Sequence, residues 1–175
     1  MRPSKWVNTS ASITTTPWEW TPSCCVSRRT YGPGKTARHG KMGVTSQIVE
    51  APAAGKPFHL PQGGDEKDDF IYNKDSALGI YLATVADNPK SRIYNIGTGI
   101  GLTLRDFERA LRKHIPDADI RIGPGLNFLG MPYSPHGVYD ISRAQAELGF
   151  VPEYDVEAGV EDYLDKLRGL KARPT

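Results

Sequence analysis

The stretch RIYNIGTGIG, residues 92–101, decides the fold class of this chain. It begins with the β-branched and aromatic residues typical of a strand and continues into a glycine-rich turn. Thr103, with Asp106 three positions later, then resembles a capping box, and apolar residues at helical spacing follow as far as Pro116. A strand that leads through a turn into a helix is the repeating unit of α/β proteins.

Helix and strand patterns alternate on both sides of this unit, so we predict an α/β fold. Asp75 precedes an apolar stripe at helical spacing, which predicts a helix that Asp75 caps. The stripe consists of Ala77, Ile80, Tyr81, Thr84 and Val85. Further helices are expected at 142–148, where Gly149 ends the helix, and after Asp155. Strand-like runs cover residues 57–60, 69–72, 92–96 and 120–122.

The composition changes near position 30. Residues 1–29 contain all three tryptophans, both cysteines and a single acidic residue, without a lasting apolar period. We therefore expect this segment to be irregular or disordered, followed by an ordered region at 30–168 and a tail at 169–175. An organelle transit peptide is the alternative for the first segment, although its Trp and Cys clusters are unusual for one.

Charge and cysteine usage exclude several classes of protein. A net charge of +2 without a basic stripe argues against nucleic acid as a partner, and no apolar run is long enough for a membrane span. Cys24 and Cys25 are adjacent, which prevents a disulfide framework, and the histidines lack metal-ligand spacing. The sequence therefore favours a cytoplasmic protein without a metal site.

Two glycine motifs require separate interpretation. Gly34-Lys35-Thr36 matches the end of a phosphate-binding loop, but Arg29 stands where that loop needs its first glycine. Residues 97–101 resemble a dinucleotide fingerprint, but Leu102 occupies the position of the third glycine. An ordinary strand-to-helix turn is therefore the favoured interpretation of this stretch.

Four motifs in order together resemble one known family. They are YGPG at 31–34, DFIYNKDSA at 69–77 after a Gly-Gly pair, YNIGTG at 94–99, and DISRA at 140–144 with its exit at 148–152. This pattern is similar to that of the extended short-chain dehydrogenase/reductases, the NAD-dependent epimerases and dehydratases of nucleotide sugars. The resemblance implies a Rossmann-type fold. The chain would be its C-terminal, substrate-side portion, with the N-terminal dinucleotide-binding half missing.

The resemblance also implies site residues. Tyr31 would bind the cofactor, NAD or NADP, and Lys67, Asp68 and His136 would bind a sugar or sugar-nucleotide substrate. The family often has arginines at or near two of these positions to clamp a pyrophosphate, so Asp68 and His136 put a nucleotide-diphosphate substrate in question. A homodimer is left open.

No catalytic residue is assigned. Tyr31 and Lys35 match the family's Tyr-x-x-x-Lys pattern in letters, but Gly32-Pro33-Gly34 cannot form the helix that this pair requires. Whether the chain alone is an enzyme therefore stays open, and a non-catalytic binding or interaction protein is the alternative.

The first 29 residues also fit a frame-shifted reading. Joining the last base of each permitted codon to the first two bases of the next can give ATKQVGEHFGINYHNTLGVDTVVLRFA for residues 2–28. That reading resembles the family's catalytic-lysine helix and the strand that leads into YGPG. Sequencing the locus tests this hypothesis, which requires a dinucleotide fingerprint and a Tyr-x-x-x-Lys upstream in the shifted frame.

Overall fold

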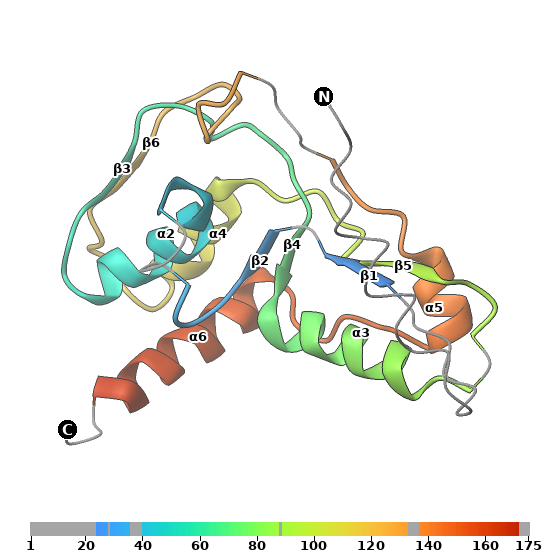
Figure 1. Cartoon of the computed structure of the whole chain (residues 1–175). Coiled ribbons are helices and arrows are strands. Elements are labelled where there is room, and N and C mark those ends of the chain that lie inside the picture. The colour runs from blue at the N-terminus through green and yellow to red at the C-terminus, as the bar shows by residue number, and fades with distance from the viewer. Residues whose placement is uncertain (1–23, 28, 36–39, 88, 133–136, 172–175) are drawn as a thin grey trace.

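The computed structural model describes residues 24–27, 29–35, 40–87, 89–132 and 137–171. Helices and strands alternate along these residues (Figure 1), which confirms the α/β class. None of the helices in these ranges is both long and apolar enough to cross a membrane. The elements in chain order are β1 Cys24–Ser27, β2 Arg29–Tyr31, the 3-10 turn η1 Gly40–Gly43, α2 Val44–Ala53, β3 Phe58–Leu60, β4 Phe70–Tyr72, α3 Asn73–Val85, β5 Ile93–Ile96, α4 Leu104–Arg112, β6 Ile120–Ile122, α5 Ser142–Leu148 and α6 Val156–Lys171.

Within the described residues, the strands pair two by two, and each pair is parallel. Strand β1 pairs with β5, β2 with β4, and β3 with β6. Figure 1 shows β2 and β4 between the other two pairs, with α3 and α5 near β1 and β5, and α2 and α4 on the side of β3 and β6. Parallel strands need crossover connections. Helix α3 lies in the connection between β4 and β5.

Three expected helices form where their local signals place them. The backbone N–H and the hydroxyl of Thr103 both donate to the Asp106 carboxylate at 2.7 Å, which confirms the capping box of α4. Helix α5 spans Ser142–Leu148 and ends at Gly149, whose φ is 65°. The Asp155 carboxylate accepts a bond from the Ala158 N–H at 2.8 Å at the start of α6.

The expected segment boundaries are wrong at both ends of the ordered region. Cys24–Ser27 and Arg29 belong to strands, because β5 and β4 supply parallel partners that no local sequence period reveals. Residues 1–23 and 28 lie outside the described residues. At the other end α6 continues to Lys171, supported by an ion pair of 2.9 Å between Arg168 and Asp165, so residues 169–171 are not a tail.

Helix α3 forms, but its buried face is not the expected stripe. The helix begins at Asn73, so Asp75 lies inside its first turn rather than at its cap. Ser76, Gly79 and Ala83 face the core instead, because these small side chains let the helix approach the sheet closely. A Cβ atom at Gly79 would lie 2.6 Å from Cγ2 of Ile96 in β5.

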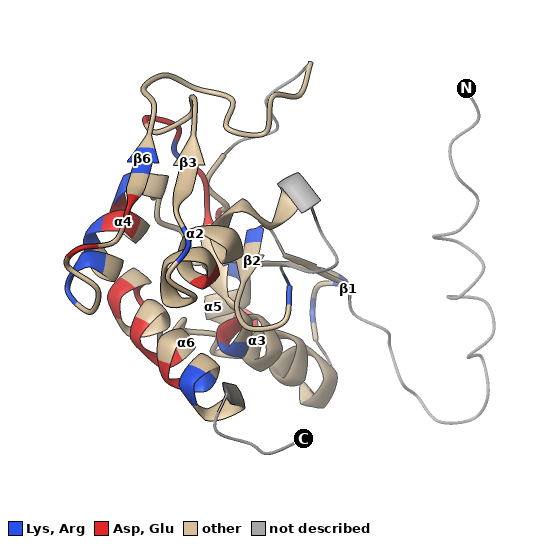
Figure 2. Cartoon of the chain, turned by 90° about the vertical axis from the view of Figure 1, so that its left-hand side faces the viewer, with Lys and Arg blue, Asp and Glu red and all other residues tan. Residues whose placement is uncertain are grey.

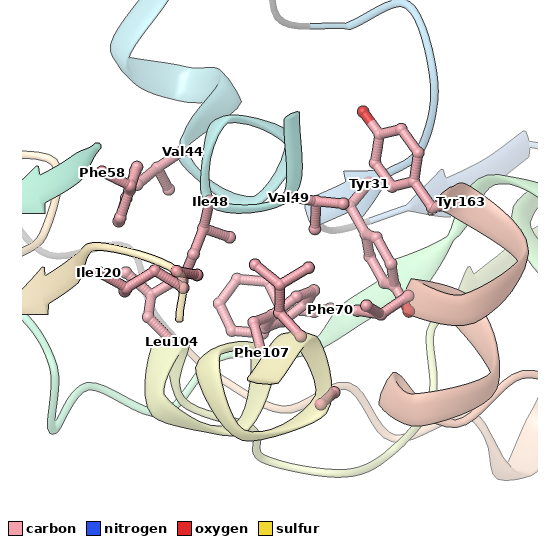
Figure 3. Close-up of a cluster of buried hydrophobic side chains, with 14 of the residues drawn as sticks. Tyr31, Val44, Ile48, Val49, Phe58, Phe70, Leu104, Phe107, Ile120 and Tyr163 are labelled. Atoms are coloured by element: carbon pink, nitrogen blue, oxygen red, sulfur yellow. The ribbon is translucent and has the colours of Figure 1, made fainter. Parts of the chain in front are cut away.

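Helix α2 carries no sequence signal that we identified, and it closes the main core. It has no side-chain cap and contains Pro52. Its residues Ile48 and Val49 nevertheless pack fully buried against α4 and α6 (Figure 3). The main core is the buried cluster of Tyr31, Val44, Ile48, Val49, Phe58, Phe70, Tyr72, Leu104, Phe107, Ala110, Leu111, Ala118, Ile120, Phe128, Leu129, Val160, Tyr163 and Leu164. A second core joins α3, α5 and β5 through Ile71, Ala83, Tyr94, Ile96, Ala144, Leu148 and Phe150.

Tyr31 lies at the centre of the main core. Its ring meets Phe107 edge-on at 4.9 Å between centroids and Tyr72 at 5.2 Å. On its other side the hydroxyl lies against Gly159 of α6, where an added Cβ would be 2.1 Å from the oxygen. Glycine at position 159 therefore makes room for the phenol.

We expect Gly159→Ala to lower the free energy of unfolding by about 1–3 kcal/mol, because the new methyl group collides with the Tyr31 hydroxyl. Gly169→Ala in the same helix is the matched control. A Cβ there would meet no atom within 4 Å, so its better helix propensity should stabilise the protein by up to about 1 kcal/mol. Urea unfolding of both variants decides, and equal stabilisation by the two changes would contradict this packing.

Candidate functional site

The candidate site is formed by the loop that follows β2 and by the start of α3. Residues 30–35 and Asn73 line a cavity of about 300 Å³. The Lys35 ammonium donates to the Thr30 carbonyl, and burial, followed by the charge of Arg29, lowers the pKa of Lys35. Asn73 lies directly over Gly32, where an added Cβ would be 2.6 Å from Cγ of the asparagine. The loop is therefore held in a compact turn beside the start of α3.

The Tyr31 side chain packs into the main core. It is 1% exposed, and burial, followed by the charges of Asp75 and Asp155, raises the pKa of its phenol. A catalytic tyrosine needs the opposite shift. Tyr31 ends a strand and Lys35 lies beyond a turn, so they do not share a helix face. The expected cofactor contact of Tyr31 stays a prediction, and the residue is among those that line the cavity.

Asp68 lies in a buried ion pair. Its carboxylate is fully buried and accepts a bond from Nε of Arg29, whose guanidinium lies 5.0 Å from the Phe128 ring centroid. The Gly137 N–H also donates to Asp68, at 3.4 Å. The arginine in this region therefore comes from β2, whereas the family commonly places one at the position of Asp68. Arg29 lies close to the YGPG motif in the sequence, which indicates a place near the loop. No local sequence pattern identifies Asp68 as its partner.

The other expected substrate contacts are placed differently. Lys67 is exposed, beside Gly101: a Cβ at the glycine would lie 3.6 Å from Cβ of the lysine. His136 lies outside the described residues. The structure thus brings Lys67 and Asp68 together only as chain neighbours, and their roles in substrate binding stay predictions.

Asp69 is a buried residue whose role the sequence did not reveal. Its carboxylate accepts bonds from the Thr98 N–H at 2.8 Å, the Thr98 hydroxyl at 2.7 Å and the Gly99 N–H at 3.1 Å. The Tyr139 N–H donates to it as well, at 3.3 Å. In a dinucleotide site, glycine-turn amides point at the phosphates of the cofactor. Here the amides of Thr98 and Gly99 bind Asp69, which supports the interpretation of residues 97–101 as an ordinary turn.

Asp75 joins α3 to the segment before α6. Its carboxylate accepts bonds from the backbone N–H groups of Glu153 at 2.9 Å and Tyr154 at 3.0 Å. Burial raises the pKa of this carboxyl, while the two backbone donors oppose the shift. The acidic residue therefore holds the first turn of α3 to the segment that leads into α6.

Together, the parallel strand pairs, the glycine turn after β5 and the YGPG loop define a Rossmann-type α/β protein. Residues 23–97 match the model of the NAD dependent epimerase/dehydratase family. The chain is 24% identical to dTDP-L-rhamnose 4-epimerase of Burkholderia thailandensis, over 74% of this chain and 35% of that protein. It is 31% identical to ADP-L-glycero-D-manno-heptose-6-epimerase of Fusobacterium nucleatum, over 58% of this chain and 32% of that protein.

Solved structures show the same relationship. UDP-glucose 4-epimerase of Thermus thermophilus in complex with NAD matches with a TM-score of 0.63 at 26% identity, over 83% of this chain and 46% of that chain. The Thermotoga maritima UDP-glucose 4-epimerase with UDP-glucose matches with a TM-score of 0.67 at 23% identity, over 84% of this chain and 46% of that chain. The chain thus resembles the NAD-dependent epimerase/dehydratases, the extended short-chain dehydrogenase/reductases, in the part that the family model matches and in its fold. It spans about a third of the length of the curated relatives that it matches.

We expect Asp69→Asn to lower the free energy of unfolding by about 2–4 kcal/mol, because an amide keeps one acceptor oxygen and turns its NH₂ towards backbone donors. Asp117→Asn, at an exposed position, is the matched control and should change stability by less than about 0.5 kcal/mol. Urea unfolding at neutral pH measures both. Equal effects would show that the carboxylate does not hold the turn.

Alkaline unfolding tests the burial of Tyr31. The phenol of the unfolded chain loses its proton above a pH of about 10, whereas the phenol of the folded protein keeps it. The contribution of Tyr31 to the free energy of unfolding is therefore fully present below that pH and decreases above it. Between pH 10 and 11.5, we expect Tyr31→Phe to reduce the loss of unfolding free energy by up to about 1.4 kcal/mol per pH unit. The exposed Tyr81, changed to Phe, should leave the slope unchanged. Identical slopes in all three proteins would contradict the burial of the phenol.

Proposed function

We propose that this chain is the substrate-side portion of an NAD(P)-dependent sugar or nucleotide-sugar epimerase/dehydratase, and that it catalyses no turnover by itself. The match to the family model supports the class of reaction, in which the nicotinamide takes and returns a hydride and a tyrosine moves a proton. The chain's own contribution is the rim of the site: the loop at 30–35, the Arg29–Asp68 pair and the turn after β5.

The hydrogen bonding of the glycine turn carries this proposal. The Thr98 and Gly99 amides already bind the buried Asp69 carboxylate. A cofactor phosphate at this turn would have to approach that carboxylate and displace it, which like-charge repulsion opposes. The Tyr31 phenol is buried as well, so it is not available to transfer a proton to a ligand.

The substrate is proposed from the class of the relatives and from the charges at the site. The Thermotoga protein was solved with UDP-glucose, so the intact relatives include nucleotide-sugar enzymes. In this chain Asp68 neutralises Arg29, which leaves Lys67 and His136 as the proposed contacts to an anionic substrate group. A sugar with less phosphate charge than a nucleotide diphosphate fits this weaker set of cations.

The second candidate is a non-catalytic binding or interaction protein on the same fold. The occupied glycine turn favours it, because a binding protein needs no hydride carrier. For both candidates, the choice between NAD and NADP concerns the cofactor site of the intact family members. The adjacent cysteines are compatible with the reducing cytoplasm that we propose as the location of the protein.

We expect calorimetric titration of the purified chain with NAD or NADP to give no saturable heat, because the amides of its glycine turn already bind Asp69. Incubation with UDP-glucose and NAD should likewise yield no epimer. The Thermotoga UDP-glucose 4-epimerase is the positive control in both assays. A saturable isotherm with the chain would refute the proposed inactivity and favour a cofactor site in it.

A chimera tests the family assignment separately. With a dinucleotide-binding half from a relative joined ahead of β1, Lys35→Ala should lower turnover less than about tenfold, because Lys35 only braces the loop through Thr30. Replacing the supplied catalytic tyrosine by Phe should cost about 10²-fold or more. A chimera that tolerates loss of that tyrosine but not of Lys35 would overturn the assignment.

A further inference from the structure

Lys35 ends the loop at 30–35, and its surroundings differ from those of the lysines on the helix surfaces. Figure 2 shows bands of both charges on α4 and α6. There Lys113, just after α4, pairs with the carboxylate of Glu157 in α6 at 2.6 Å. The Lys35 ammonium instead donates to the uncharged carbonyl oxygen of Thr30. Lys35 therefore has a neutral acceptor where Lys113 has an acid.

These surroundings favour the neutral amine of Lys35. The side chain is half-buried, and burial is the larger of the two influences that lower its pKa. The guanidinium of Arg29 adds to the shift, because a second cation nearby disfavours the ammonium. No carboxylate of the described residues contributes to the pKa of Lys35. At neutral pH the fraction of neutral amine is therefore larger than for a lysine in water.

Lys35 also lines a cavity that is large enough for a small ligand. The cavity of about 300 Å³ beside residues 30–35 and Asn73 lies at the lower end of the range of ligand pockets. The bond to Thr30 uses one N–H of Nζ and holds the nitrogen in place, which leaves the lone pair of the neutral amine available. Desolvation and a neighbouring cation are the two conditions that activate lysines as nucleophiles towards carbonyl compounds.

The lining of the cavity indicates which carbonyl compound it suits. Apart from Lys35, none of the lining residues carries a charge. Asn73 contributes a carboxamide, which has both donors and acceptors, and Gly32 and Gly34 have no side chains to cover the backbone groups of the loop. An uncharged ligand with several hydroxyl groups fits such a lining better than a phosphate ester does. An aldehyde of this kind is the open-chain form of a sugar.

We propose that Lys35 is a covalent capture site for the aldehyde of a small, uncharged open-chain sugar. Its Nζ adds to the aldehyde carbon, the two amine protons leave with the carbonyl oxygen as water, and a C=N bond remains. The product is an imine, and its formation needs neither an oxidant nor a reductant. The step requires no nicotinamide and no front half, so it goes beyond the proposed function and is a property of this chain alone.

Reductive trapping of the full chain tests the proposal. Glyceraldehyde is the probe, cyanoborohydride reduces the imine to a stable secondary amine, and peptide mass spectrometry measures the label at each lysine. At neutral pH we expect Lys35 to be labelled at least about tenfold faster than the exposed Lys56 and Lys113, because more of its amine is neutral. Labelling of Lys35 that is no faster than that of these two lysines overturns the proposal.

The dependence on aldehyde concentration separates a binding site from a merely reactive amine. If the cavity holds the sugar, the labelling rate at Lys35 should reach half of its maximum on the order of 1–10 mM glyceraldehyde, as expected of a very small ligand. The rate at the exposed Lys56 should stay proportional to concentration over the same range. A rate at Lys35 that is equally proportional would show that no site binds the sugar, and would refute the proposal.

A single isosteric substitution tests the part of the cavity wall. Asn73→Asp keeps the shape of the side chain and suits the first turn of α3, but it places a carboxylate in the cavity. The new charge should favour the ammonium of Lys35 and slow its labelling several-fold. Gln145→Glu, at an exposed position of α5, is the matched control and should leave the rate unchanged. An unchanged rate in a folded Asn73→Asp protein, with its helix content verified by circular dichroism, contradicts the proposed site.

Discussion

The carboxylate of Asp69 joins segments that are far apart in the chain, and the arrangement of the second core depends on it. It stands just before β4, yet its four donors come from the turn after β5 and from the segment that leads to α5. A buried carboxylate is tolerated only with such compensation, so the three segments are fixed together. Gly97 completes the contact, because a Cβ there would lie 2.5 Å from an oxygen of Asp69. The glycine turn that resembles a cofactor fingerprint is therefore needed for a structural reason.

Local signals in the sequence predicted the elements whose causes are local. The Thr103 capping box, the α5 boundaries and the Asp155 cap depend on residues within one turn of the helix, and all three form as expected. Strand β1 was missed because its hydrogen bonds come from β5, almost seventy positions away in the chain. The orientation of α3 was missed because Gly79 allows a closer approach to Ile96 than the larger stripe residues would. Apolar periodicity measures hydrophobicity but not steric fit.

The candidate site shows the same limit. The YGPG motif identified the loop, but it did not reveal that the Tyr31 ring points into the main core, between Phe107 and Gly159 (Figure 3). Asp68 stands where the family commonly has an arginine, but the sequence does not reveal that Arg29 pairs with Asp68. Opposite charges thirty-nine positions apart give no periodic signal. Motifs therefore located the site, while long-range packing determined which groups are available in it.

The parallel pairing of the strands has a consequence for how the chain reaches this state. The paired strands begin at Cys24 and Ile93, at Arg29 and Phe70, and at Phe58 and Ile120, so none of the described pairs can form as a local hairpin. A pair of two short strands is not stable alone. Each of these pairs closes a long loop, and the entropic cost of closure comes before the packing contacts that offset it. The strand pairs therefore form only as the main core collapses. Slow folding, with strand edges exposed in the meantime, follows from this topology and makes association between folding chains a competing process.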